Sequence, residues 1–285
     1  MASSDFSYGY PKPALENTDQ GQTATLFLFA VQLQCFGFAG IAFREALLAD
    51  VTVFAWKSAP AILALFLAAS TWFVPLRRPA LFTIALLFAA VPLSKAWFGQ
   101  SPMDALSPVS SAARFGLPLA AALGIHERLF SPDRRMLGFV SGLLTISIAL
   151  TFTGHGIKAL AAAPHFVALI HYSALNVFAW SPDAALMALA LSAIGAIDLV
   201  VSLTVVAIWF RPVGERRERI MKAALVYMIV WGALTAVSRA SAFGWSHLPD
   251  VLFRSAHFVV PWVLLHLRAE ATASRWSGRR SPRPD

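Results

Sequence analysis

Residues 153–160, with the sequence TGHGIKAL, close a long apolar segment of this 285-residue chain. A plainer version of the same segment occurs in the first half, where residues 38–43 (FAGIAF) align with residues 152–157 (FTGHGI). The alignment predicts a duplicated chain in which the second copy kept or gained the polar residues.

Four further matches follow in the same order along the two halves. VFAW at 53–56 recurs at 177–180, Arg78-Pro79 matches Arg211-Pro212, SKA at 94–96 matches SRA at 238–240, and RFGLP at 114–118 matches HFVVP at 257–261. The spacing between matched segments grows mainly in the predicted connections and at helix ends, where a duplicated fold tolerates insertions. The order of the matches therefore favours duplication over chance similarity.

The composition predicts a membrane protein. Apolar residues make up 58% of the chain and charged residues only 13%, whereas an ordinary soluble domain has about a quarter charged residues. Eight apolar segments approach the roughly 20 residues that a helix needs to cross a bilayer. They cover residues 25–43, 54–75, 80–97, 109–125, 137–157, 184–209, 223–238 and 251–267. We expect an all-α membrane protein with about eight transmembrane helices, arranged as two parallel four-helix repeats.

Basic residues orient these segments. Most of the 23 Lys and Arg lie in the two tails and in the connections after the second, fourth and sixth segments. By the positive-inside rule, these parts lie in the cytoplasm, so we expect an inner-membrane protein with both termini cytoplasmic. The net charge of +8 is explained by topology and anionic lipid headgroups, so no nucleic-acid partner is predicted.

The domain organisation follows from these segments. We expect a polar N-terminal tail at 1–22 without a signal peptide, a first repeat at 23–130, a second repeat at 136–268 and a basic disordered tail at 269–285. Within the second repeat, residues 159–176 are expected to lie as a tilted or amphipathic stretch over the outer face.

Asp198 is the residue whose placement in the predicted membrane region costs the most free energy. It lies near the middle of the sixth segment, where a carboxylate costs roughly 2.5 to 3.5 kcal/mol even on the most lenient scale. Gly195, Asp198 and Ser202 share one helical face. A residue of this kind is a candidate for function, and the alternative is a protonated Asp198 that only holds a neighbouring helix.

Cationic and imidazole groups are predicted to gather at the outer end of the second repeat. His155 and Lys158 are neighbours on one helix surface, and Arg239, Arg254 and His257 are expected nearby. Such a rim suits an anion or the polar head of a lipid-soluble molecule such as a quinone. The alternative is that these side chains only reach the membrane interface.

The second half resembles the DoxX-like membrane proteins. The resemblance rests on Gly154-His155-Gly156 with Lys158, on Phe166, and on Asp198 beside small residues in the next helix. It implies a four-helix unit that serves a membrane redox assembly, with quinone as a ligand and a membrane or periplasmic redox protein as a partner. The first copy departs from this pattern, because Ile41 replaces His155 and Arg44 replaces Lys158.

Other functions remain open or are disfavoured. A proton-linked transporter of small solutes would use Asp198 as its titrating group, and a structural subunit would use the polar groups only to bind neighbouring proteins. The histidine spacing disfavours haem and gives no metal site, and no phosphate-binding loop or nucleophile motif occurs. No catalytic residue is therefore predicted, and an activity of the chain on its own is not expected.

Overall fold

The computed structural model describes residues 17–49, 51–126, 129–130, 134–211 and 214–277. Almost all of these residues are helical, apart from a short antiparallel hairpin of β1 (Ile125–His126) and β2 (Leu129–Phe130). The helices of the first half are α1 (Asn17–Leu47), α2 (Val51–Ser70), α3 (Val74–Phe98), α4 (Ser107–Ser110) and α5 (Ala112–Gly124). Those of the second half are α6 (Arg134–Leu160), α7 (Pro164–Phe178), α8 (Ala184–Trp209), α9 (Glu215–Phe243), α10 (Leu248–Phe253) and α11 (Ala256–Ser277). The parts of the predicted tails at 1–16 and 278–285 lie outside the described residues.

Within the described residues, six helical segments are long and apolar enough to cross a membrane. They lie in α1, α3, α6, α8 and α9 and at residues 245–268, which include α10 and the first part of α11. The other two predicted spans also form apolar helices, but their apolar parts at 56–70 and 112–124 are shorter. At 1.5 Å per residue, the 13 residues of α5 extend only about 20 Å, against roughly 30 Å of hydrocarbon. The structure therefore has the all-α architecture of a multi-pass membrane protein.

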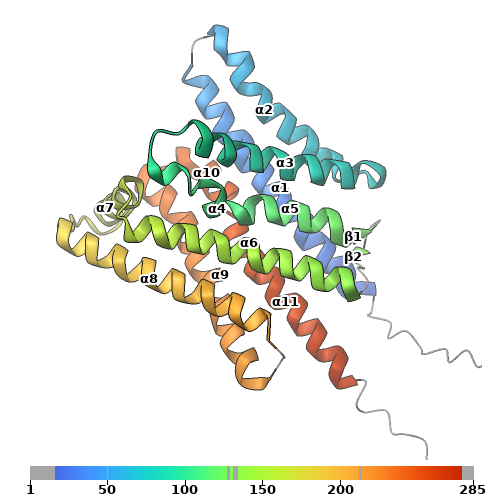
Figure 1. The fold of residues 1–285 in the computed structure, drawn as a ribbon. Coiled ribbons are helices and arrows are strands. Elements are labelled where there is room, and N and C mark those ends of the chain that lie inside the picture. Colours follow the sequence, from blue (N-terminus) through green and yellow to red (C-terminus); the bar gives the residue numbers. More distant parts are fainter. Residues whose placement is uncertain (1–16, 50, 127–128, 131–133, 212–213, 278–285) are drawn as a thin grey trace, which may run out of the picture.

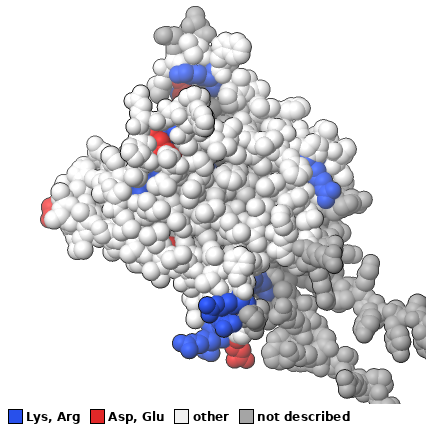
Figure 2. Space-filling view, in the orientation of Figure 1, with Lys and Arg blue, Asp and Glu red and all other residues white. Residues whose placement is uncertain are grey.

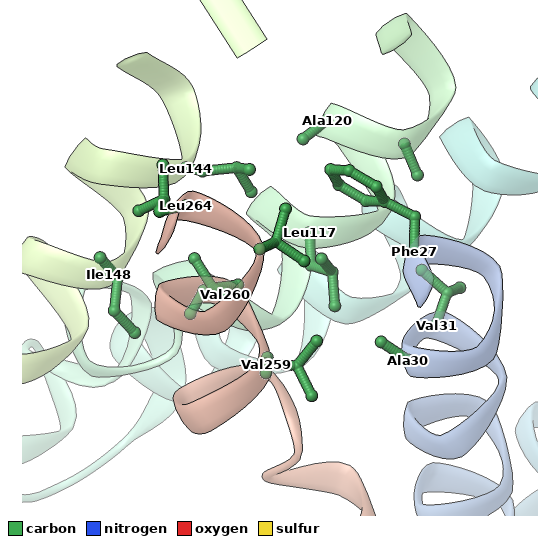
Figure 3. Packing of buried hydrophobic residues seen from close by; sticks show 14 of the residues in the cluster. Phe27, Ala30, Val31, Leu117, Ala120, Leu144, Ile148, Val259, Val260 and Leu264 are labelled. Carbon is green, nitrogen blue, oxygen red and sulfur yellow. The ribbon is translucent and has the colours of Figure 1, made fainter. Parts of the chain in front are cut away.

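The buried residues of the two predicted repeats belong to one core. Helices α1, α5, α6 and α11 pack around this core, while α2 and α3 lie on α1 and α5, and α8 and α9 lie on α6 and α11. Figure 3 shows Phe27, Ala30 and Val31 of α1, Leu117 and Ala120 of α5, Leu144 and Ile148 of α6, and Val259, Val260 and Leu264 of α11 turned toward one another. The core thus joins both halves of the chain.

Short helices cross between the two halves. α10, from the second half, packs on α1, whereas α4, from the first half, packs on α6. A glycine allows the close approach at each contact. Gly40 of α1 lies against Pro249 of α10, and Gly154 of α6 lies against Ser110 of α4. A Cβ atom on either glycine would lie under 3.0 Å from its neighbour.

The outer surface of the helices is apolar. Many large apolar side chains are exposed, among them Phe66 of α2, Leu86 of α3, and Leu189 and Leu203 of α8. An extensive apolar surface of this kind is unfavourable in water. Figure 2 shows a broad area of the visible face without charged residues. In Figure 1, α1 begins and α11 ends on the same side of the molecule, as an even number of crossings requires.

The predicted surface stretch at 159–176 forms a separate helix, α7. Pro164 starts α7, because its missing N–H would have no partner in the first turn. Ala179 ends the helix in the left-handed conformation, with φ 50°. Asp183 then caps α8 by accepting a hydrogen bond from the backbone N–H of Leu186 at 2.7 Å. As a result α7 lies against α9 and α8, beside the end of α6.

Candidate functional site

The two glycines beside His155 hold α6 close to two other helices. A Cβ atom on Gly154 would lie 2.7 Å from the backbone nitrogen of Ser110 in α4, and one on Gly156 would lie 2.9 Å from the carbonyl oxygen of Gly195 in α8. Only glycine leaves enough room for backbones at this separation. The histidine between them is therefore held in place by contacts on both sides of α6.

His155 contacts His257 of α11. The two rings pack edge to face, with centroids 5.2 Å apart and an interplanar angle of 88°. His155 also packs edge to face on Phe166 of α7, at 5.7 Å. Both ring nitrogens of His155 and Nε2 of His257 are buried without a hydrogen-bond partner among the described residues. Buried polar atoms usually have a partner, so these atoms suit a ligand.

A cavity of about 500 Å³ lies beside these rings. Most of its wall is apolar and comes from α6, α7, α8 and α9, including Phe152, Phe166, Leu191 and Trp231. The polar groups are few: His155 and His257, Arg239 and Arg254, Asp198, and serine and threonine hydroxyls. An apolar cavity with a few polar groups in its wall is typical of a small-molecule binding site.

Asp198 lines this cavity and is 3% exposed. Tyr227 of α9 donates a hydrogen bond from Oη to the Oδ1 atom of Asp198 at 2.8 Å. Ser202 donates to the backbone carbonyl of Asp198, so it supports the helix and leaves the carboxyl group available to Tyr227. Gly195, Asp198 and Ser202 are all buried, which confirms that they share the inward face of α8.

A second cavity of about 340 Å³ lies on the other side of three shared residues, His155, Arg239 and Arg254. The rest of its wall combines apolar residues, such as Val91 and Phe253, with many polar ones, and comes from α3, α4, α5, α6, α7 and α10. The charged or polar residues found only in this second cavity are Lys95, Ser107, Ser110, Ser111, Arg114, Lys158 and His165. None of the described residues that line it is acidic.

Lys158 reaches into the second cavity from α6. It is 7% exposed, and its Nζ donates a hydrogen bond to Ser110 Oγ at 2.9 Å. Arg114 stacks its guanidinium on the ring of Phe253 at 4.5 Å, and its Nε atom is buried without a hydrogen-bond partner, as is the Nε atom of Arg239. The cations therefore converge without a carboxylate among them.

Two groups outside the spans modify the charge of this region. The backbone N–H of Ser101 donates to Asp104 and lowers the pKa of that carboxyl, which stays ionised and pairs with Lys95 at 3.3 Å. His165 has part of its surface open to the cavity, but desolvation of its ring and then the charges of Arg239 and Lys158 lower its pKa to about 4. His165 is therefore neutral at pH 7, and the positive charge comes from the Lys and Arg side chains.

All six residues predicted for the site line one or both cavities. Asp198 and His257 line the first, Lys158 lines the second, and His155, Arg239 and Arg254 line both. Lys95, Ser110 and Arg114 also line the second cavity, but they come from the predicted first repeat and were not expected at the site. Nothing in the sequence pattern placed these residues near His155, because contacts such as that of α4 with α6 join residues far apart in the chain.

No protein-family description, curated protein or solved structure matches this chain.

Proposed function

We propose that this chain is a multi-pass inner-membrane protein that binds a lipid-soluble molecule with a polar head, of the quinone class, as a subunit of a membrane redox assembly. The observation that carries the proposal is the first cavity, which combines an apolar wall with imidazole and guanidinium groups. The apolar wall suits a hydrophobic ring or tail, and the polar groups suit carbonyl or hydroxyl oxygens. The DoxX-like resemblance of the second half points to the same function.

The polar groups are suited to orienting such a head. Nε2 of His257 and both ring nitrogens of His155 have no other hydrogen-bond partner among the described residues, so they can contact a ligand oxygen. Asp198 and Tyr227 already form a donor–acceptor pair on the wall contributed by α8 and α9. The edge-to-face contact of the two histidine rings favours a joint wall over a pair of opposed haem ligands, which would need the porphyrin between them.

The reciprocal helix contacts support the proposed duplication. α1 packs on α10 and α6 packs on α4, and the glycines at these crossings, Gly40 and Gly154, are the ones that the sequence repeat aligns. We propose that each repeat covers the first helix of the other with the short helix before its own last helix. In this arrangement both termini are cytoplasmic and the site lies near the outer membrane face.

A binding experiment tests the proposed ligand. The protein is purified in detergent and titrated with decylubiquinone, and binding is followed by quenching of tryptophan fluorescence, because Trp231 lines the cavity. The variant Ala174→Phe fills the cavity and should abolish binding, since Ala174 is buried and lines the cavity. Ala188→Phe is the matched control, because Ala188 is exposed on α8 and does not line the cavity.

The outcome separates the candidate functions. Saturable quenching that is lost only in Ala174→Phe supports quinone binding, whereas equal quenching in both variants overturns it. A proton-linked transporter is the second candidate, because Asp198 lines a cavity and has a hydrogen-bond partner there. Solute uptake into liposomes that depends on pH and is lost in Asp198→Asn would favour this candidate.

A further inference from the structure

The second cavity brings several positive charges together, and a neutral quinone in the first cavity would not neutralise them. Arg114, Arg239 and Arg254 line it together with Lys158. Within the described parts of the chain, none of these four side chains forms an ion pair. Arginine stays protonated in proteins, so the charges of Arg114, Arg239 and Arg254 cannot be removed by loss of a proton. Several unpaired charges in a largely buried place are strongly unfavourable unless a counter-ion joins them.

The carboxylates near the second cavity already form ion pairs with other cations. Asp104 pairs with Lys95, and Asp250 pairs with Arg44 at 2.9 Å and contacts His247 at 2.9 Å. Lys95 is 63% exposed in its side chain, so its pair with Asp104 lies at the edge of the cavity. The protein therefore leaves the inner cations of the cavity without a negative partner of their own.

Arg44 and Lys158 differ in the kind of group that each contacts. The proposed repeat aligns these two residues, and each reaches toward a short helix of the other half. Arg44 meets a carboxylate, Asp250, whereas Lys158 meets an uncharged hydroxyl, Ser110. Arg44 is therefore neutralised by a carboxylate of the same chain, whereas Lys158 forms no ion pair among the described residues.

We propose that the second cavity binds an oxyanion of the phosphate class. Arg114, Lys158, Arg239 and Arg254 supply the positive charge, and the hydroxyl groups of Ser107 and Ser111 supply further hydrogen-bond donors. Guanidinium groups match the geometry of tetrahedral oxyanions, which accept several charge-assisted hydrogen bonds at once. The volume of about 340 Å³ is several times that of a water molecule, which occupies roughly 30 Å³ in the liquid.

The anion site shares His155, Arg239 and Arg254 with the quinone site, whereas Arg114, Lys158 and the serines line only the second cavity. A free phosphate ion and the phosphate of a lipid headgroup present the same chemistry to this cavity. The two sources differ in how they reach it, so the experiment needs one arm for each.

In the first arm, protein in dodecyl maltoside micelles, which contain no phosphate group, is titrated with inorganic phosphate at constant ionic strength, and the unfolding temperature is measured. We expect phosphate to raise this temperature by several degrees, because a ligand that binds only the folded state stabilises it. In Lys158→Gln the apparent phosphate affinity should fall roughly tenfold, as expected for loss of one charged hydrogen-bond donor. Lys158→Arg keeps the charge and should bind within about threefold of the wild type.

The matched control is Lys57→Gln, the same substitution at an exposed position on α2. It should leave the phosphate response unchanged. Equal responses of Lys158→Gln and Lys57→Gln, or an equal effect of chloride, would overturn the proposal. Decylubiquinone binding to Lys158→Gln is measured in parallel, because Lys158 does not line the first cavity. Loss of phosphate binding with intact quinone binding separates the two sites.

The second arm adds phosphatidylglycerol to these phosphate-free micelles and omits inorganic phosphate. Stabilisation that depends on Lys158 in this arm alone identifies a lipid headgroup as the source, whereas stabilisation in the first arm identifies a free anion. Absence of a Lys158-dependent effect in both arms contradicts the proposal. If Lys158→Gln does not fold, Ser111→Ala provides a second variant, for which we expect about a threefold loss of affinity.

Discussion

Gly156 of α6 and Gly195 of α8 face each other across the helix crossing beside the site. A Cβ atom on Gly156 would lie 2.9 Å from the carbonyl oxygen of Gly195, and a Cβ atom on Gly195 would lie 2.7 Å from that of Gly156. Each glycine makes room for the backbone of the other. This close approach fixes the distance between His155 on α6 and Asp198 on α8, and therefore the width of the first cavity.

We expect Gly195→Ala to destabilise the protein by about 1–3 kcal/mol, because the added methyl group forces α6 and α8 apart. Unfolding in mixed micelles of detergent and SDS measures the loss. Gly138→Ala on α6 is the control, since a Cβ atom there meets nothing within 4 Å. The control should be neutral or stabilising by about 0.5–1 kcal/mol. A similar loss in both variants would argue against the close crossing.

The positions of the helices could be predicted from the sequence, but the contacts between them could not. Apolar length and small residues predicted helical segments close to α1, α6 and α8, and placed Gly195, Asp198 and Ser202 on one face. The same periodicity holds no information on which helix packs against which. The contacts of α4 with α6 and of α10 with α1 depend on side chains far apart in the sequence. The contact of α4 with α6 brings Ser110 beside Lys158 in the wall of the second cavity.

Tyr227→Phe removes the hydrogen bond to Asp198 and should cost about 0.5–1.5 kcal/mol. The loss is expected because Asp198 is 3% exposed, so water cannot readily take the place of the phenol hydroxyl. Chemical unfolding measures it. Tyr172→Phe is the control, because Tyr172 is 44% exposed. If Tyr172→Phe costs as much as Tyr227→Phe, the hydrogen bond does not stabilise the fold.

The candidate site was predictable only in part, for a physical reason. Polar residues are rare in an apolar chain, so the sequence alone could suggest candidates: His155, Lys158, Asp198, Arg239, Arg254 and His257. Arg114 lies in a segment that the sequence assigned to the first repeat. It reaches the site because α5 packs directly on α6 in the shared core.

Asp250→Asn should destabilise the protein more than Arg44→Gln. Without Arg44, Asp250 keeps its contact with His247, whereas without Asp250 both Arg44 and the nearby arginines lose their nearest carboxylate. For the pair itself we expect a coupling energy of about 1 kcal/mol, because both side chains are about a quarter exposed. A double-mutant cycle measures this coupling. Equal losses in the two single variants would contradict the proposed order.

Thiol labelling tests the expected orientation in the membrane. Cys35 is the only cysteine and is fully buried, so the native protein should not react with a membrane-impermeant maleimide. Gln100, after α3, and Glu215, at the start of α9, are both exposed. Because the basic connection before α9 is expected in the cytoplasm, Gln100→Cys should be labelled in intact cells and Glu215→Cys only after membrane disruption. Labelling of both variants in intact cells would show that the segments between them cross the bilayer an even number of times, and the short helix α5 would then be the segment that fails to cross.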